Sequence, residues 1–460
     1  MSEYFGTSIA AIANSIGISI LGLGVGPLLW NPLAQAIGHR PVYLISWTLF
    51  VPCTFWLAFS KDYSTFAAGR FFTGFTSGVC QVLPATSITH LYKPEWRGTA
   101  LSLWSLLLIL GPPTAPLITS AVTLAHEWQY TYYIVIIFTG LEWFLIFFFC
   151  GETHYTPPSA EELSAFEGRS SSPALTGKDD GDKSQGVVSG DLEDGYNGRS
   201  SNMPSGHVGF VYNPIKRPLH FLKQAFEPIS FAIHIPLLLP AVWGALAFGW
   251  SVGITIVLPQ VLGSPTYGFT RMLVGCCYIA ILVGSVIGKF YGGYGSDWCV
   301  TFFTKRKGDG VRVPEYRLWN MILPAIIMLP ALIVFGYGFG QRMAWWVPVI
   351  FGAGLYYIGV VATASVLQTY MAEIAPGGKS MSAVQLYNLF KTIFSFAVPF
   401  FLPDWLSLPS WEMGTAGTFG TSYLAQSLIN TVGWLLIVAL LIVAGKRIRK
   451  AQGTVRPTAA

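Results

Sequence analysis

The stretch IPLLLPAVWGALAFGWSVGITIVLPQVLG, from Ile235 to Gly263, determines what kind of protein this sequence encodes. It contains no lysine, arginine, aspartate or glutamate, and the charge-free run around it extends from residue 228 to residue 270. A helix needs about 20 mostly apolar residues to cross the hydrocarbon core of a bilayer. The run is long enough for one such helix and a turn, and Pro259 and Gly263 indicate where the helix ends.

The composition of the whole chain extends this observation. Hydrophobic residues make up 52 % of the 460 residues and charged residues only 11 %, whereas a soluble globular domain carries about 25 % charge. Aromatic residues, at 15 %, exclude a long disordered chain. The composition excludes a cytosolic enzyme and a secreted disulfide module, and it predicts a protein with many membrane spans. The net charge of +5 is too small to indicate a nucleic-acid partner.

Motifs of soluble catalysis are missing from the sequence. There is no phosphate-binding Walker loop, no zinc-protease motif and no G-x-S-x-G elbow. The cysteines lie in or at the edges of apolar stretches without metal-ligand or disulfide spacing, so we interpret them as small core residues. They are Cys53, Cys80, Cys150, Cys276, Cys277 and Cys299. We expect no enzyme activity, no cofactor and no metal.

About eleven segments are long and apolar enough to span a bilayer as helices. They run near residues 9–31, 41–60, 66–90, 98–122, 130–150, 229–260, 270–293, 318–338, 344–371, 380–402 and 422–445. The sequence therefore predicts an all-α membrane protein.

The lysines and arginines predict the orientation, because cytoplasmic loops carry an excess of them. If the loop after the first span is cytoplasmic, most of the 27 lysines and arginines fall in inner loops and in the C-terminal tail, whereas the outer loops hold Lys61, Arg271 and Arg342. The sequence GKRIRK, Gly445–Lys450, fits a cytoplasmic end to the last span. An odd number of spans places the N-terminus outside, although Met1–Thr7 has no feature of a signal peptide.

One long segment differs from the rest and divides the chain. Residues 155–227 are rich in Ser, Gly, Asp and Glu, as in GRSSSPALTGKDDGDKSQGVVSGDLEDGYNGRSSN from Gly168 to Asn202. Such a composition cannot bury a core and predicts a disordered cytoplasmic loop. The loop separates an N-terminal helix bundle, residues 1–154, from a C-terminal bundle, residues 228–448. A cytoplasmic tail, residues 449–460, follows.

The two bundles contain a weak internal repeat. GPLLWNPLAQAIGHRP, Gly26–Pro41, follows the first span, and GKFYGGYGSDWCV, Gly288–Val300, follows the seventh. In both, a glycine-rich helix end runs into a short cytoplasmic turn. Repeated helix bundles related by an axis along the membrane normal are the plan of one large class of transporters.

Several motifs, in order and at the expected spans, resemble the major facilitator superfamily, and specifically fungal members of its twelve-spanner drug:proton antiporter family. GPLLWNPLAQAIGHRPVY, from Gly26, is similar to the family's first cytoplasmic motif. Arg70-x-x-x-Gly74-x-x-x-Gly78 resembles its fourth-helix motif, and GPPTAPLITS, Gly111–Ser120, its fifth-helix motif. Further matches are Gly151-Glu152-Thr153, the usual exit from helix six, and SDW, Ser296–Trp298, followed by VPEYRL, Val313–Leu318, which is typical of one fungal branch.

The resemblance implies a major facilitator fold of two pseudo-symmetric bundles. It also implies that MSEYFGTS at the start is the outer loop between the family's first and second helices, so that helix one of the twelve would be absent. The implied partners are a small organic substrate, protons and the lipid bilayer, and the implied state is a monomer.

Two departures from the family pattern are informative. At the family's aspartate in the first motif stands Gln35, which can hydrogen-bond but cannot supply a charge, whereas Arg40 is retained and Asp297 keeps its carboxylate in the second half. We interpret Gln35, Arg40, Asp297 and Arg317 as a conformational latch, with a solvated charged loop as the alternative. In the fifth-helix motif Pro116 is present, but the expected glycines are Ala115, Thr119 and Ser120, which weakens the implied export direction.

Three residues are candidates for proton coupling. Glu142 lies near the middle of its span, where a carboxylate can exchange protons; the alternative is a protonated glutamate bonded to a neighbouring helix. The resemblance ties Arg70 to proton coupling, and the alternative is that it snorkels to the surface. His234 can titrate near neutral pH, although a lone histidine is more often structural. For Gly74 and Gly78 we expect close helix packing.

The candidates for the substrate cavity are polar or amphipathic residues on spans that the resemblance places beside it. They are Gln81, Trp243, Tyr356, Tyr357, Gln368 and Gln385, and for each of them helix packing is the alternative. Lys391 lies in mid-span, where similar fungal transporters carry Arg or Lys, and Asn388 shares its helix face. A cavity-facing lysine would attract an anionic group or repel a cation, whereas the alternative is a hydrogen bond to a neighbouring carbonyl.

Three hypotheses of function follow. The first is a secondary active transporter that exports a drug, toxin or secondary metabolite in exchange for protons by alternating access. The second is a proton-coupled importer of a nutrient or polyamine. The third is a truncated, non-transporting membrane protein. The C-terminal sequence TVRPTAA contains no organelle-retrieval signal, so the plasma membrane is the expected location.

Overall fold

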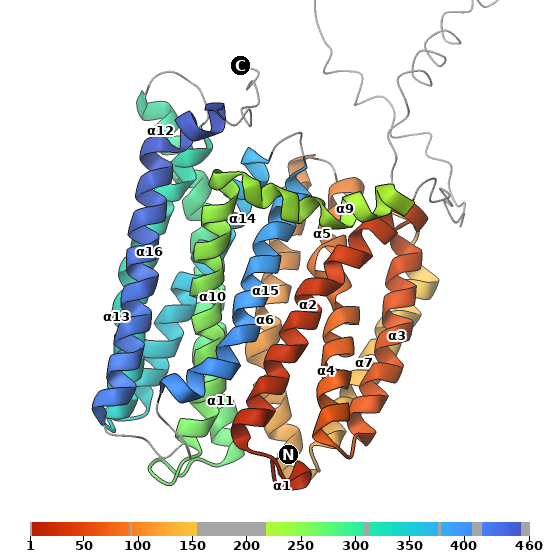
Figure 1. Cartoon of the computed structure of the whole chain (residues 1–460), viewed down its shortest axis with the longest axis vertical. Helices are drawn as coiled ribbons and strands as arrows, with labels where there is room; N and C mark the ends of the chain where they lie inside the picture. Colours follow the sequence, from red (N-terminus) through yellow and green to blue (C-terminus); the bar gives the residue numbers. More distant parts are fainter. Residues whose placement is uncertain are drawn as a thin grey trace, which may run out of the picture.

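The computed structural model describes residues 2–92, 94–153, 218–307, 313–375, 379–406 and 416–451. Within these ranges the chain is helical and contains no strand. The helices form two bundles that stand side by side (Figure 1). The expected all-α membrane fold of two helix bundles is therefore confirmed.

The N-terminal bundle begins with the short helix α1 and continues through long helices. Its elements are α1 (Ser2–Phe5), α2 (Ile9–Ile37), α3 (His39–Phe59), α4 (Tyr63–Ser77), the 3-10 turn η1 (Gly78–Gln81), α5 (Leu83–Leu91), α6 (Pro94–Ala125) and α7 (Gln129–Phe149).

The C-terminal bundle has the same long-helix design with more irregular turns. Its elements are α9 (Pro218–Ser230), η3 (Phe231–Ile233), α10 (Ile235–Leu262), α11 (Arg271–Phe290), the π-helical η4 (Tyr291–Gly295), α12 (Ser296–Lys307), the 3-10 helix η5 (Pro314–Met321), α13 (Ile322–Gly340), the π-helical η6 (Val347–Gly354), α14 (Leu355–Ile374), α15 (Ser380–Trp405) and α16 (Ala416–Ala451).

Ten helices in the described ranges are long and apolar enough to cross a membrane. They correspond to ten of the predicted spans. The continuous span expected at 66–90 is wrong, because α4 ends at Ser77 and η1 separates it from α5. Pro84, in the first turn of α5, has no N–H for the carbonyl of Cys80, and its ring would clash with that carbonyl in an unbroken helix.

The loop expected at 155–227 ends earlier than predicted. Residues 218–227 form most of α9, and residues 154–217 lie outside the described ranges. α9 lies across one end of the bundles, in contact with α2 and α15 (Figure 1). These contacts give the segment a packing surface that its sequence alone did not reveal. In the same way α16 continues through Ala451 into the expected tail, of which residues 452–460 are not described.

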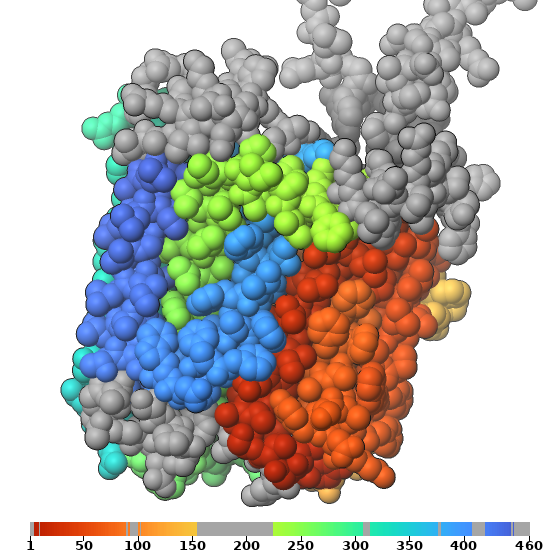
Figure 2. Space-filling model, in the orientation of Figure 1, coloured from red at the N-terminus to blue at the C-terminus, as the bar shows by residue number. Residues whose placement is uncertain are grey.

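Two pairs of helices join the bundles: α2 packs along α15, and α6 packs along α11. Figure 2 shows α2 and α15 side by side on one face of the molecule. Close approach depends on glycine in both pairs, because a Cβ at Gly24 would overlap the hydroxyl of Thr392 and a Cβ at Gly275 would overlap the hydroxyl of Ser120. Asn31 of α2 also donates a hydrogen bond of 3.2 Å to Gln385 of α15.

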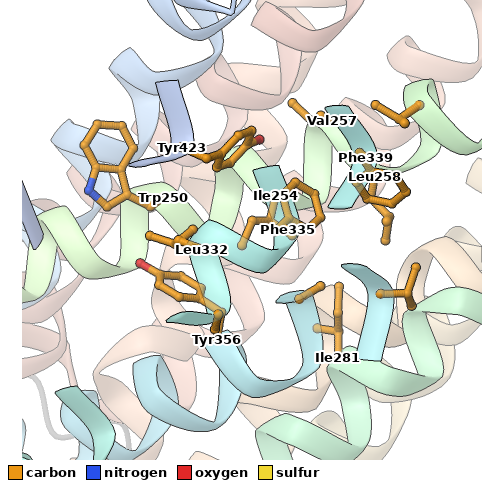
Figure 3. Close-up of a cluster of buried hydrophobic side chains, with 14 of the residues drawn as sticks. Trp250, Ile254, Val257, Leu258, Ile281, Leu332, Phe335, Phe339, Tyr356 and Tyr423 are labelled. Carbon is orange, nitrogen blue, oxygen red and sulfur yellow. The ribbon is translucent and has the colours of Figure 1, made fainter. Parts of the chain in front are cut away.

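The largest buried core lies within the C-terminal bundle. Aromatic and branched side chains of α10, α11, α13, α14 and α16 meet there (Figure 3), among them Trp250, Ile254, Phe335, Tyr356 and Tyr423. The core of the N-terminal bundle is smaller and centres on Trp30, whose ring nitrogen donates a 2.8 Å hydrogen bond to the carbonyl of Phe75. The larger part of the buried core thus lies on the C-terminal side of the molecule.

Candidate functional site

A cavity of about 2290 Å³ lies between the two bundles. Its walls come from α2, α4, α5 and α6 on one side and from α10, α11, α14 and α15 on the other. Single ligand pockets usually measure about 300–1,000 Å³, so this space exceeds what one small molecule fills. It extends from residues near Arg271, at the start of α11, to residues near Lys379, at the start of α15. We call the end of the molecule that carries Asp297, Lys379 and α9 the inner face.

Five of the eight cavity candidates line it, namely Gln81, Tyr357, Gln368, Asn388 and Lys391. Residues to which other roles were assigned line it too: the proton-coupling candidate Arg70, Pro116 of the fifth-helix motif, and Gln35, Asp297 and Arg317 of the expected latch. They come from both bundles, as a site at the boundary between two halves requires. Their proposed roles stay predictions.

Three of the cavity candidates instead serve packing and are not among the lining residues. Trp243 is fully buried, and its ring nitrogen donates to the carbonyl of Asn430 at 3.0 Å. Tyr356 is also fully buried and donates to the carbonyl of Ala247 at 2.9 Å. Gln385 accepts the hydrogen bond from Asn31 that joins α15 to α2. The packing alternative therefore describes these side chains better than the cavity prediction.

Two of the proton-coupling candidates also lie away from the cavity. Glu142 is an exposed side chain of α7, and α7 contributes no residue to the cavity wall in the described ranges. His234 is the residue that immediately precedes α10, and its ring lies 6.1 Å from that of Phe231. Neither position brings the side chain near the space where a substrate would bind.

Arg70 of α4 does line the cavity. Its guanidinium lies over the rings of Phe66 and Tyr132, with 5.1 Å and 5.7 Å between the Cζ atom and the ring centres. Its Nε atom is buried and has no hydrogen-bond partner in the described ranges. Aromatic faces favour a cation, but they leave the guanidinium's hydrogen-bonding capacity unused.

Lys391 occupies the middle of α15 and points at the α10 wall. Its ammonium nitrogen lies 4.8 Å from the centre of the Phe248 ring and 6.0 Å from that of Tyr387. Among the described residues it forms no ion pair. Asn388, one turn earlier on the same helix face, is buried, and its Oδ1 atom has no hydrogen-bond partner.

Lys289 of α11 is a second cavity lysine, which the sequence analysis did not select. Its ammonium donates to the hydroxyl of Ser365 on α14 at 3.2 Å. The sequence placed it in the last turn of a span, where lysines commonly extend to the membrane surface. The direction of the Lys289 side chain depends on the packing of α11 against α14, which the sequence around Lys289 does not reveal.

A cluster of hydrogen-bonded hydroxyl groups lies on the cavity wall formed by α10, α11 and α14. The hydroxyl of Tyr357 contacts the hydroxyl of Thr255 at 2.6 Å and donates to the carbonyl of Ser251 at 3.0 Å. Tyr278 of α11 donates to the carbonyl of Thr255 at 2.7 Å. All of these residues line the cavity, so the cluster offers fixed hydroxyl groups on an otherwise apolar wall.

At the inner face, Arg317 is the centre of an ion-pair network. The guanidinium lies 2.7 Å from a carboxylate oxygen of Asp297 and 2.7 Å from one of Glu373, and it donates to the hydroxyl of Ser296 at 3.0 Å. The network joins α12, η5 and α14 within the C-terminal bundle. The expected proximity of Asp297 and Arg317 is present, and Glu373 is a member that the sequence analysis missed.

The matching junction of the N-terminal bundle is built differently. Gln35 lines the cavity as an exposed side chain. Arg40 donates to the carbonyl of Phe147 at 2.7 Å. The carboxylate of Glu152 accepts the backbone N–H groups of His39 and Arg40 at 2.9 Å and 3.2 Å, so it caps the start of α3.

A further contact lies at the inner end of the cavity. Glu227 of α9 forms an ion pair with Lys379 and accepts a hydrogen bond of 3.0 Å from Ser382 of α15. This contact ties the end of α9 to the start of α15. It was not foreseen because Glu227 was assigned to the disordered loop.

Glycine packing on α4 agrees with the expectation for Gly74. A Cβ at Gly74 would overlap the carbonyl oxygen of Ser19 on α2, and one at Gly78 would lie 2.9 Å from the ring of Pro27. Both glycines therefore let α2 and α4 approach closely.

Two helix bundles around a central cavity define the class of secondary membrane transporters. Residues 1–399 match the Major Facilitator Superfamily profile, and the chain therefore belongs to this superfamily of integral membrane transporters, which are not enzymes. The family resemblance inferred from the motifs is confirmed.

Fungal transporters are among the similar proteins. The chain is 24 % identical over 476 residues to the MFS antiporter QDR3 of Candida albicans, covering 86 % of this chain and 68 % of that protein. It is 26 % identical over 446 residues to the cycloheximide resistance protein of Candida maltosa, covering 94 % and 72 %. A solved D-xylose–proton symporter matches with a TM-score of 0.57 at 13 % identity, covering 92 % of this chain and 87 % of that chain. At this identity the structural likeness concerns the fold alone.

Proposed function

We propose that this protein is a proton-coupled antiporter that exports a small organic molecule by alternating access. The observation that carries the proposal is the cavity between the bundles, which has a mainly apolar wall with a few fixed polar groups from both halves. Such a lining suits an amphipathic organic molecule. The relatives named for antiport and for cycloheximide resistance support the export direction.

The two inter-bundle contacts suggest how access would alternate. Because α2 meets α15 and α6 meets α11, rocking of one bundle against the other would open one face as it closes the other. α9 contacts both α2 and α15, so it lies where the two bundles would move relative to each other at the inner face. Arg70 is retained as the proton-coupling candidate because it lines the cavity, whereas Glu142 and His234 do not.

The location and state of the protein belong to the same proposal. We expect a monomer in the plasma membrane with a cytoplasmic C-terminus, because lysine and arginine cluster at the inner face and in the C-terminal tail. The inner face is then the cytoplasmic face. A C-terminal epitope tag that antibody reaches only after permeabilisation would support this orientation, and labelling of intact cells would contradict it.

Transport in inside-out plasma-membrane vesicles tests the function. In vesicles from fungal cells that express the full chain, an acidic lumen should drive accumulation of a panel of fluorescent organic dyes, and a protonophore should abolish it. Vesicles from cells with an empty vector are the control. Dye accumulation that the protonophore does not reduce would overturn proton coupling. Dye uptake by intact cells, in place of accumulation in the vesicles, would favour the importer hypothesis. Absence of movement for the whole panel would favour a non-transporting protein.

A further inference from the structure

The walls of the central cavity carry an imbalance of charge. The basic side chains that line it are Arg70, Arg271, Lys289, Arg317, Lys379 and Lys391, and the acidic ones are Glu227 and Asp297. Both carboxylates are engaged at the inner face, where Asp297 pairs with Arg317 and Glu227 pairs with Lys379. Among the described residues, the other four basic side chains of the cavity therefore have no carboxylate partner. They are Arg70, Arg271, Lys289 and Lys391.

Lys391 is the cation most clearly available to a ligand. Its contacts are with the rings of Phe248 and Tyr387, which favour a cation but do not neutralise it. Asn388, three residues before it, lines the same cavity at 6 % exposure, and its Oδ1 atom has no hydrogen-bond partner among the described residues. Residues three apart on a helix share a face, so a cation that can bind an acidic group and an amide oxygen that can accept a hydrogen bond from the ligand's body lie on one wall.

Lys289 adds a second positive charge nearer to the inner face. An ammonium group has three donors, and the hydroxyl of Ser365 accepts one of them at 3.2 Å. Among the described residues, the remaining donors of Lys289, like those of Lys391, have no hydrogen-bond acceptor and can bind oxygen atoms of a ligand. Ser365 and Gln368 of α14 lie along the same stretch of cavity wall.

Unpaired cations between apolar walls are costly, because low-dielectric surroundings strengthen electrostatic interactions and penalise an uncompensated charge. A ligand that brings a negative group removes this cost, whereas a cationic ligand increases it. The potential of several like charges in one cleft also raises the local concentration of oppositely charged ligands.

We infer that the central cavity binds organic anions, with the acidic group held by the cavity lysines Lys391 and Lys289 and the apolar body against Phe248, beside Lys391, and other apolar side chains of the wall. The inference deepens the proposed function, on which it rests, by naming the substrate class. It selects carboxylates, sulfonates or phosphates that are attached to an apolar or aromatic body. It also disfavours polyamines, which carry positive charge.

The first experiment measures the potential inside the cavity without any transport. Ala364→Cys places a thiol on the α14 wall, and Thr266→Cys places a reference thiol on the exposed α10–α11 loop. Each is reacted with an anionic reagent, sulfonatoethyl methanethiosulfonate, and a cationic one, trimethylammonioethyl methanethiosulfonate. Peptide mass spectrometry reads the label at that position alone, so the native cysteines can stay.

The anion-to-cation rate ratio should be about 10-fold higher at the cavity thiol than at the reference thiol, a factor equivalent to about 1.4 kcal/mol. Lys391→Gln and Lys289→Gln should each lower the ratio, and the pair together should remove the difference. The matched control Lys61→Gln, an exposed lysine in the outer loop, should leave it unchanged. Equal ratios at the two thiols would overturn the inference. If Ala364→Cys does not fold, Leu108→Cys on the α6 wall is the second reporter.

The second experiment uses fluorescein, an anion at neutral pH, and rhodamine 123, a cation with the same ring system, in the inside-out vesicles. Fluorescein should accumulate and rhodamine 123 should not, with fluorescein transport reduced by Lys391→Gln and retained by Lys391→Arg. Transport of rhodamine 123 alone would overturn the anion inference and leave the transport function standing. A high anion-to-cation thiol ratio without transport of any dye would support the anion site and overturn the transport function.

Discussion

Each half of the molecule has a glycine-rich helix end that runs into a short turn at the inner face, at Gly26–Pro41 in the N-terminal half and at Gly288–Val300 in the C-terminal half. The interactions that stabilise the two turns differ. In the C-terminal half, Arg317 joins α12, η5 and α14 through Asp297 and Glu373. In the N-terminal half, Gln35 has no charge, and Glu152 caps α3 through backbone N–H groups instead. Two similar stretches of sequence can thus form similar turns although only one of them forms ion pairs.

This difference predicts how each half responds to loss of its central residue. Removal of Arg317 leaves the carboxylates of Asp297 and Glu373 without their cation. Removal of Glu152 or Arg40 instead leaves backbone N–H or C=O groups, which can form hydrogen bonds with water.

Removal of the Arg317 guanidinium should have the largest effect. Arg317→Ala should destabilise the protein by about 2–3 kcal/mol, because it removes the hydrogen bonds of a buried guanidinium to Asp297, Glu373 and Ser296 and leaves the partly buried Glu373 carboxylate without its partner. The apparent melting temperature of detergent-solubilised protein should fall clearly. The control is Arg306→Ala, which removes an exposed arginine that only lies over the ring of Phe302. Equal melting of Arg317→Ala and the unmodified protein would show that the network contributes nothing to stability.

Removal of the cap on α3 should have a smaller effect in the other half. Glu152→Ala should cost about 1–2 kcal/mol, since it removes the acceptor for two backbone N–H groups and a negative charge from a helix N-terminus. Glu152→Gln keeps an acceptor and should lose less. Amide hydrogen exchange at the start of α3 should rise in step with this loss. If exchange there stays unchanged, the cap does not hold the helix end.

Arg40→Ala provides the direct comparison with Arg317→Ala. It removes one donor to the Phe147 carbonyl, so the expected loss is about 1 kcal/mol. The same melting measurement applies to both arginines. A loss as large as that of Arg317→Ala would mean that the N-terminal junction contains a comparable ion-pair network, and the contrast between the halves would fail.

The smallest effect on stability should come from Asp297→Asn. The Asp297 side chain is 69 % exposed and Glu373 still pairs with Arg317, so the loss should be below about 1 kcal/mol. The substitution should instead shift the balance between the inward and outward states. Thiols introduced by Gln260→Cys and Met381→Cys, at the outer and inner ends of the cavity, report this balance. Unchanged labelling of both thiols would count against a latch.

Much of the fold was predictable because long apolar segments in a bilayer have few alternatives to a helix. Ten predicted spans match helices, and the exception, at 66–90, is broken where Pro84 removes a helix hydrogen bond. The position of α9 was not predictable, because a short amphipathic helix in a polar segment is stabilised by what it packs against. Its partners, α2 and α15, are distant in sequence.

The candidate site was predicted in part. Lys391, Asn388 and Tyr357 were correctly placed at the cavity wall, whereas Trp243 and Tyr356 were not. Tyr356 and Tyr357 are neighbours in sequence, but successive side chains point about 100° apart around a helix. Because both side chains are tyrosines, the residue type did not show which of them faces the cavity and which faces the core.

The membrane class, the two helix bundles and the family could be predicted from the amino-acid sequence, because they depend on apolar length, charge distribution and local motifs. Which polar groups share the central space depends on how the helices pack. This packing brought Lys289 of α11 and Lys391 of α15 into one cavity, placed Gln385 against Asn31, and joined Glu373 to Arg317. The physical reason is that the direction of a side chain on a buried helix depends on the packing of distant helices around it.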